Sequence, residues 1–589
     1  TVNLNATGII TVSAGETVDA GANTITLISD DFDVAGNVTT TGDIDLRRQT
    51  AGAFGLGTGG LLDDAELGRI TAENLLIGNG ANVDDIQVDN VSNTTVSGKV
   101  TLASTAMIDF VNNPSTFTNA ELQAFAATML SNSVLLTVGG NAELLSSGAI
   151  AVDSIDASGN VNLNATGDVT ISGDVMSTGD LSIDGDTISI LTSAMTSSGA
   201  VLRADTDLTL AATASLEATG AVGFSANNDM TIVGNVTTTA DVIALNADGE
   251  KNGVGNFSLG GAATLQTGNN GTISVEGENV DLDSTGIIDP NNAGDAGTLN
   301  ISADLNGNGG GTATISKNAD LTGVGSLIVD NGATDITFGL GAGDDLLADI
   351  LNDHITGDID ISTTGVITIN DQLGGAGTND VTLTAGNIDI DDAIDIKGTL
   401  DITSTTTDIT IDGTLSGGAT TISSNTSIVA NQLITALGDV ELDSGTATTL
   451  SGGITADGFD IDVDADGGTL TIDTVTVQST GAGNVALAGD DVDIDVAIDA
   501  GTGTLDITST NTDITIDGSA MTSADATIDA ATDLTLAATA SLTATGVVDF
   551  DADDDMTING NVTTTAGSIS LSADADEDAA PPSRRRRRR

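Results

Sequence analysis

Hydrophobic and polar residues alternate over one long passage of the chain. From Asp207 to Ala240 ("DLTLAATASLEATGAVGFSANNDMTIVGNVTTTA") apolar or small side chains occupy the even positions. A period of two is typical of β-strands with one buried face. Twenty-nine alternating residues would form a strand of about 95 Å, far beyond the usual strand length. The chain must therefore turn corners while keeping one face inward, as a β-solenoid does.

The same passage returns at Asp533 to Ala566, 326 positions later, and differs at only seven positions. Six of the seven differences fall on odd positions, so the even face is preserved while the odd face varies. The exception, Asn228 to Asp554, has polar neighbours and predicts a turn. A second passage repeats 105 positions apart, at Gly398–Gly413 and Gly503–Gly518. Both pairs indicate structural repeats of one fold.

A tetrad of Asp, apolar residue, Thr or Asp, and apolar residue recurs along the chain. Adjacent tetrads often begin 20 to 23 positions apart, as at 207 and 229, 335 and 358, and 513 and 533. Periods of 20 to 50 residues indicate solenoids or arrays. The pattern predicts an all-β fold, a parallel β-helix with about one tetrad per coil. At roughly 4.8 Å per coil, the chain would form a rod on the order of 130 Å long.

Residues 1–578 are expected to form a single β-solenoid with three short helices leaning on it, at 63–70, 118–130 and 344–355. The strongest helix signal is "TNAELQAFAATML", where Thr118 and Glu121 form a capping-box pattern before an apolar stripe.

The last residues, 579–589, switch abruptly to prolines and six arginines, Arg584 to Arg589. Nothing else in the chain has this composition, which favours an added tag or another non-native segment. The alternative is a basic tail that docks on an acidic neighbour. At the other end, Thr1 already lies in strand-like sequence without a signal peptide, so the chain is expected to be a mature or excised part of something longer.

The composition suits a narrow solenoid. The chain has no Cys, Trp or Tyr and a formal net charge of −71. Without cysteine there is no disulfide framework or thiolate metal site. The charge repels nucleic acids and anionic membranes and attracts cations. No run of 18 apolar residues occurs, so no membrane span is expected.

Catalysis is not expected. His354 is the only histidine, so it has neither a second histidine nor a cysteine for a relay or a zinc site. Carboxylates are abundant enough for a glycosidase pair, which leaves a polysaccharide-active β-helix enzyme as an alternative. Sugar subsites usually also use aromatic platforms and basic groups, which are scarce here.

The best local hypothesis for a site is calcium binding by Asp462, Asp464, Asp466 and Asp473, in "DVDADGGTLTID". These acids and the glycine at loop position 6 match the spacing of an EF-hand loop. The alternative is a strand that points Ile461, Val463 and Ala465 inward and the aspartates outward. Diffuse association of calcium with the acidic rows of the surface is a further alternative, and no other cofactor is expected.

Threonine ladders that bind ice or a crystal surface are a further hypothesis, from the three "NVTTT" copies at Asn37, Asn235 and Asn561. A flat ladder needs Thr-x-Thr at one place on consecutive coils. These copies are hundreds of residues apart, so they are not expected to build such a face.

Two passages, Ala22–Leu46 ("ANTITLISDDFDVAGNVTTTGDIDL") and Phe54–Asn79 ("FGLGTGGLLDDAELGRITAENLLIGN"), resemble giant bacterial surface proteins of the filamentous-haemagglutinin-like adhesin type. The likeness covers most of the chain. It implies a right-handed parallel β-helix, export, and attachment or scaffolding outside the cell. The secretion domain of that family is not recognisable here, and no functional residue transfers.

These observations together predict a secreted or cell-surface structural protein, an acidic rod that self-assembles into a filament or surface-layer fibre. A monomeric adhesin stalk carrying a binding tip is the alternative. Other copies of the chain are the expected partners, with contact to a cell surface or polysaccharide as a further expectation and no nucleic acid.

Overall fold

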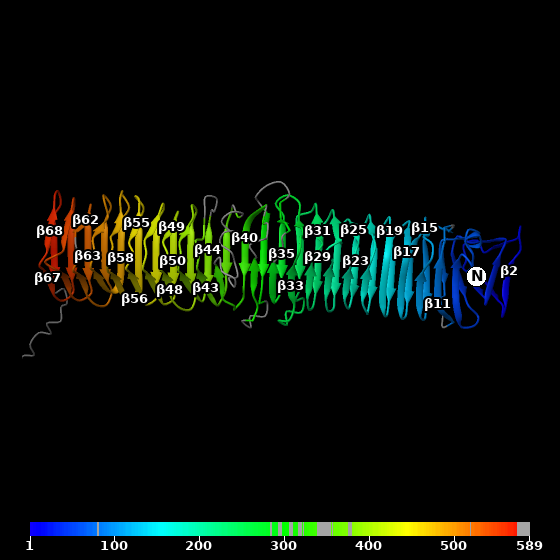
Figure 1. Ribbon diagram of the computed structural model, residues 1–589. Helices are drawn as coiled ribbons and strands as arrows, with labels where there is room; N and C mark the ends of the chain where they lie inside the picture. Colours follow the sequence, from blue (N-terminus) through cyan, green and yellow to red (C-terminus); the bar gives the residue numbers. More distant parts are fainter. Residues whose placement is uncertain are drawn as a thin grey trace, which may run out of the picture. The chain divides into compact units, whose positions relative to one another are not determined.

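The computed structural model describes residues 1–78, 82–92, 94–282, 286–291, 297–304, 310–315, 321, 323–338, 355, 357–374, 380–518 and 520–573. It is all-β, with 58% of the chain in strands and about 25 solenoid turns. The chain divides into two compact units, Thr1–Val324 and Gly325–Arg589. Figure 1 shows the strands of each unit lying side by side in sequence order.

Most described coils of the first unit contribute a strand to each of three parallel stacks. One coil consists of β23 (Leu181–Gly185), β24 (Ile188–Ile190) and β25 (Ala194–Ser197), after which β26 (Ala200–Ala204) begins the next coil. Leu181 then lies beside Ala200 in parallel register. We call these positions the first, second and third stacks.

In the first unit, the first stack begins with β1 (Val2–Asn5) and continues to β38 (Gly297–Ser302). The second stack includes β24 and ends at β39 (Ala313–Ile315), and the third includes β25 and ends at β37 (Ile288–Asp289).

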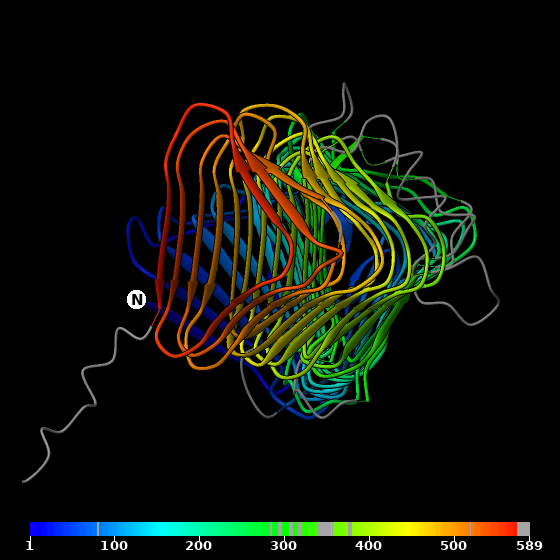
Figure 2. The same cartoon turned by 90° about the vertical axis from the view of Figure 1, so that its left-hand side faces the viewer.

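The second unit repeats the three-stack plan. Its first stack runs from β40 (Val324–Asp330) through β42 (Ile359–Ser362) to β69 (Ile569–Ala573), and its second from β41 (Ile336–Phe338) to β67 (Met556–Ile558). Among the described residues, its third stack runs through nine strands, from β46 (Ile394–Asp395) to β68 (Asn561–Thr564). Figure 2 views these coils (green through yellow to red) along their stacking direction and shows them enclosing a common interior.

The repeated passage folds identically in both copies. The first copy forms five strands, and each has a counterpart of the same length 326 positions later. The pairs are β27 (Leu208–Leu210) with β64 (Leu534–Leu536), β28 (Ser215–Ala218) with β65 (Ser541–Ala544), β29 (Val222–Ala226) with β66 (Val548–Ala552), β30 (Met230–Ile232) with β67, and β31 (Asn235–Thr238) with β68. The prediction of a structural repeat is confirmed.

Alternation of burial builds the core. In β23 the side chains of Leu181 and Ile183 are buried, whereas Ser182 and Asp184 are partly exposed. Among the largest fully buried side chains are Phe257 and Phe550. Each inward position stacks on the equivalent position of the next coil, as Ile528 does on Phe550. The interior is therefore a set of continuous apolar columns.

The coil length agrees with the predicted spacing in many places, such as Ala200 beside Val222. It also varies: the step from Leu181 to Ala200 is shorter, and the step from Leu327 to Ile359 is much longer. One predicted interval was wrong. The tetrads at 335 and 358 belong to β41 in the second stack and β42 in the first, so their spacing does not measure a coil.

The three predicted helices have different outcomes. The helix expected at 63–70 is present as α1 (Asp64–Leu67), with Asp63 and Glu66 forming a capping box. The helix expected at 118–130 is wrong: this segment contains β16 (Glu121–Ala126) and the start of β17 (Met129–Val138). Alternate residues of β16 are buried and the whole strand pairs with β13 (Lys99–Ser104), so stacking on the neighbouring coil outweighs the local helix signal. The helix expected at 344–355, apart from Ile355, lies outside the described residues.

The tail 579–589 and His354 also lie outside the described residues. Within the part of the chain that the structure describes, no helix is long and apolar enough to cross a membrane.

Candidate functional surfaces

Many aspartates and asparagines hold one coil to the next. In the second unit, the Asp439 carboxylate accepts a hydrogen bond from the Asp460 amide (3.1 Å), and the Asp460 carboxylate accepts one from the Asn484 amide (2.7 Å). The Asn484 side-chain oxygen then accepts from the Thr504 amide (3.0 Å). We call this series, from Asp439 to Thr504, the corner ladder.

The tetrads use the same arrangement. The Asp513 carboxylate accepts from the Asp533 amide (3.1 Å), and the Asp533 carboxylate accepts from the Asp555 amide (2.9 Å). In the first unit, the Asn160 side-chain oxygen likewise accepts a hydrogen bond from the Asp180 amide (2.9 Å). A short side chain with an acceptor oxygen bonds readily to nearby backbone amides. The first residue of several tetrads therefore has a structural role.

The predicted calcium segment forms a strand. Asp462, Asp464 and Asp466 lie in β56 (Ile461–Ile472), and Asp473 follows its last residue. The inward neighbours Ile461, Val463 and Ala465 are buried, as the strand alternative predicts. Alternate residues of a strand are roughly 6.6 Å apart along it, which spreads these carboxylates instead of wrapping them around one ion as an EF-hand loop does. Calcium binding by these four residues stays a prediction.

Crowding of carboxylates changes the proton affinity of the second unit's surface. Burial, and then repulsion by neighbouring carboxylates, raises the pKa of a set of aspartates that we call the crowded aspartates. They are Asp360, Asp389, Asp462, Asp464, Asp493 and Asp529. By contrast, hydrogen bonds from Ser427 and Thr426 lower the pKa of Asp408. Between 325 and 578 the sequence is rich in aspartate and has a single lysine or arginine, Lys397, so the crowding has little local compensation.

Among the described residues, one group of carboxylates comes close enough to share a cation. An oxygen from each of Asp533, Asp554 and Asp555 lies within 4.8 Å of the others. Asp554 and Asp555 are exposed, and Asp533 already caps the Asp555 amide. The signal in the sequence was the acidic run "DADDD" at 551–555, which the calcium hypothesis did not include.

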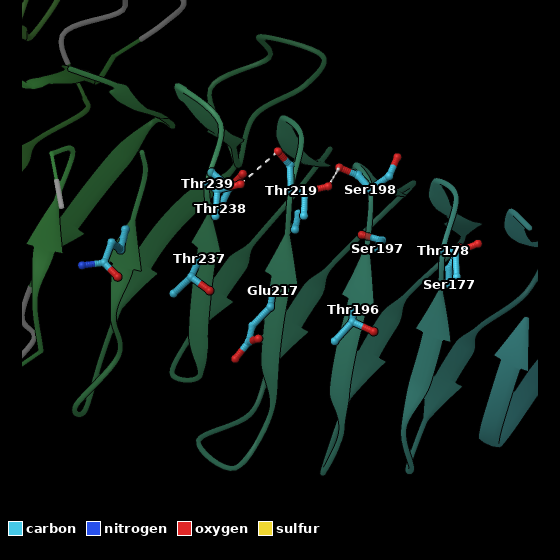
Figure 3. A pocket seen from close by; sticks show the side chains of 12 residues that line it. Ser177, Thr178, Thr196, Ser197, Ser198, Glu217, Thr219, Thr237, Thr238 and Thr239 are labelled. Atoms are coloured by element: carbon cyan, nitrogen blue, oxygen red, sulfur yellow. Dashed lines mark hydrogen bonds between the residues drawn. The ribbon is translucent and has the colours of Figure 1, made fainter. Parts of the chain in front are cut away.

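A hydroxyl-lined trough lies on the third stack of the first unit (Figure 3). It is an open hollow of about 460 Å³, and five successive coils line it. Its floor is the outward row Thr196, Glu217, Thr237 and Gln266, which stack in register on β25, β28, β31 and β34 (Leu265–Gln266). Its rim is formed where each strand turns toward the first stack, and Figure 3 shows Thr178, Ser198, Thr219 and Thr239 along this corner.

A hydroxyl ladder follows the second stack of the same unit. Thr170, Ser189, Thr209, Thr231 and Ser258 stack in register on five consecutive coils. The "NVTTT" copies instead contribute to third-stack strands, namely β6 (Asn37–Thr39), β31 and β68. The sequence pattern did not reveal this ladder, because its residues are the third residues of tetrads, such as Thr170 and Thr209, and the residues that pair with them on other coils. None of them belongs to the Thr-rich motif. It is one residue wide, so it lacks the Thr-x-Thr pattern of a flat ice-binding face.

Comparison of the chain with protein-family models, with curated proteins and with solved structures finds no match. The structure itself places the chain among repeat-built parallel β-helix proteins.

Proposed function

We propose that this chain is an extracellular structural protein that self-assembles end to end into a filament. The observation that carries the proposal is the stacking of the coils: within each unit, parallel strands pair from coil to coil, as β23, β26 and β29 do, and the inward side chains form continuous apolar columns. The coils of a further copy can continue such a stack, because a parallel strand pairs with the backbone groups of the strand before it.

Two members of the inward columns are exposed. Leu571 stacks on Phe550, and its exposed fraction is 54% whereas that of Phe550 is 0%. Leu4 stacks on Leu27, with exposed fractions of 37% and 0%. Covering Leu571 by another coil would remove apolar surface from water, which favours association by roughly 25 cal/mol for each Å² buried.

The surface chemistry supports a structural role for a long assembly. A strongly acidic exterior keeps long assemblies soluble and discourages contact with nucleic acids. The short passages that resemble filamentous-haemagglutinin-like bacterial surface proteins point in the same direction. A stack of coils joined by backbone hydrogen bonds and apolar columns resists extension without needing a ligand.

Negative-stain electron microscopy of the untagged protein in millimolar calcium tests the proposal. We expect long fibres of uniform narrow width. Leu571→Asp should shorten or abolish them because it places a charge in the exposed column. Val547→Asp is the matched control, since Val547 is also exposed (47%) and gains the same charge outside that column. Separate particles in the wild-type protein would contradict self-assembly and favour the adhesin stalk.

A further inference from the structure

The trough on the first unit has an unusual hydrogen-bonding character. At its rim, the Thr178 hydroxyl donates to the Ser158 carbonyl (2.7 Å). The Thr219 hydroxyl donates to the Ser198 carbonyl (3.3 Å) and the Thr239 hydroxyl to the Thr219 carbonyl (3.2 Å), as the dashed lines of Figure 3 show. Each hydroxyl has one proton and two lone pairs. Because these protons are already donated to the backbone, the rim offers a ligand mainly acceptors.

The floor adds a negative charge. Glu217 is exposed and is the only charged residue lining the trough. An ionised carboxylate accepts hydrogen bonds and donates none. The matching ligand therefore carries many donors and positive charge, and the net charge of −71 would steer such a ligand toward the protein.

The trough also selects for an elongated ligand. Five coils at roughly 4.8 Å spacing place the first and last lining residues about 19 Å apart along the stack. A linear ligand on this axis meets a comparable set of oxygens at each coil, on Thr196, Glu217 and Thr237 in turn.

The surroundings favour a sugar chain over a peptide. Peptides usually bind by adding a strand to a free sheet edge or by placing apolar side chains in pockets. Here β25, β28 and β31 are each paired on both sides, so no edge is open. Ala218 is the only apolar side chain among the lining residues. A polymer whose hydroxyl and ammonium groups project along its length fits this surface better.

We propose that the trough binds a linear polysaccharide that carries amino groups, lying along the coil stack with an ammonium group on Glu217. This inference is independent of filament formation, because none of the trough residues lies in β1 or β69, the strands that carry Leu4 and Leu571. Each hydrogen bond contributes little by itself, so the affinity comes from the number of coils that are engaged.

Isothermal titration calorimetry with glucosamine oligomers, from dimer to octamer, at pH 6 and moderate salt tests the proposal. We expect the affinity to rise with length and to level off once the oligomer spans the trough. N-acetylated oligomers should bind more weakly because they lack the charge. Glu217→Gln should lower the affinity about tenfold, the effect of one charge-assisted hydrogen bond.

Glu441→Gln is the matched control, since Glu441 is an exposed glutamate on β53 (Val440–Ser444) of the second unit. Equal weakening by both substitutions would mean that binding follows net charge, which overturns the proposal. Thr237→Phe should block binding by filling the trough, and unchanged binding in this variant would also overturn it. The proposal would also be overturned if hexalysine bound with an affinity that depends on Glu217 while the affinity of the glucosamine oligomers did not depend on it. Circular dichroism confirms that each variant is folded.

Discussion

The corner ladder makes a sharp prediction because two aspartates of equal charge, two positions apart, have opposite roles. The Asp460 carboxylate accepts a hydrogen bond from the Asn484 amide at 2.7 Å. Asp462 lies on the outward face of β56, where burial and then the charges of Asp443 and Asp460 raise its pKa. Asp460→Ala should destabilise the adjoining coil, whereas Asp462→Ala should leave it unchanged or slightly more stable.

The magnitude follows from the exposure of the bond. Hydrogen bonds to charged groups contribute about 1.5–3 kcal/mol, and ordinary ones about 1 kcal/mol. Asp460 and Asn484 are both exposed, so water replaces part of the lost interaction, and a cost of about 1 kcal/mol is expected for Asp460→Ala. Since about 1.4 kcal/mol corresponds to a tenfold change in an equilibrium constant, local opening should become about fivefold more frequent.

Hydrogen exchange measured by mass spectrometry on peptides around Asn484 is the suitable assay, because stacked coils open locally and a single melting temperature averages over many of them. Asp460→Asn keeps an acceptor oxygen in place, as Asn484 itself does for Thr504, and should exchange nearly as slowly as the wild type. Equal exchange in Asp460→Ala and Asp462→Ala would refute the reasoning, since both remove one charge and only Asp460 caps an amide of the next coil.

Three further outcomes are expected. Phe550→Ala should lower the stability of its coils by about 3–5 kcal/mol. Phe459→Ala, which removes a ring that is 41% exposed, should change the stability little. Similar denaturation curves for the two variants would contradict the claim that the inward apolar columns stabilise the fold. Gly468→Ala should cost about 1–3 kcal/mol or more, because a Cβ there would lie 1.1 Å from the Thr446 carbonyl oxygen. Gly223→Ala, where a Cβ would meet nothing within 4 Å, is the control, and hydrogen exchange on peptides around each glycine compares the two. The crowded aspartates have folded pKa values above the ordinary 3.8, so these groups bind protons more tightly in the folded second unit than in the unfolded chain. The stability of the unit should therefore rise as the pH falls from neutral toward these folded pKa values, and a lower melting temperature over that range would contradict the assignment.

The fold was predictable because burial of one face is a local property of each strand. The preserved even positions of the repeat become buried residues such as Leu208 and Phe224, and the polar exception at Asn228 falls in a bend between β29 and β30. The segment at 118–130 failed because its capping-box letters and apolar spacing fit a helix as well as a strand. The segment forms a strand because it pairs with β13, which lies a whole coil earlier in the chain. A pattern within the segment itself does not reveal this partner.

The candidate surfaces were harder to predict because they depend on register between coils. Coil steps are unequal, as the short step from Leu181 to Ala200 and the long step from Leu327 to Ile359 show. A fixed period therefore does not place Thr196, Glu217 and Thr237 in one row. The corner ladder was hidden for the same reason. Its aspartates look like any other acidic residue in the sequence, and only the position of the next coil's amide separates Asp460 from Asp462.

X-ray diffraction from aligned fibres of the untagged protein tests the central claim most directly. If copies stack end to end so that the coils continue along the fibre, a strong reflection near about 4.8 Å should appear along the fibre axis. A reflection of that spacing perpendicular to the axis, or the failure of the protein to form fibres, would contradict the account.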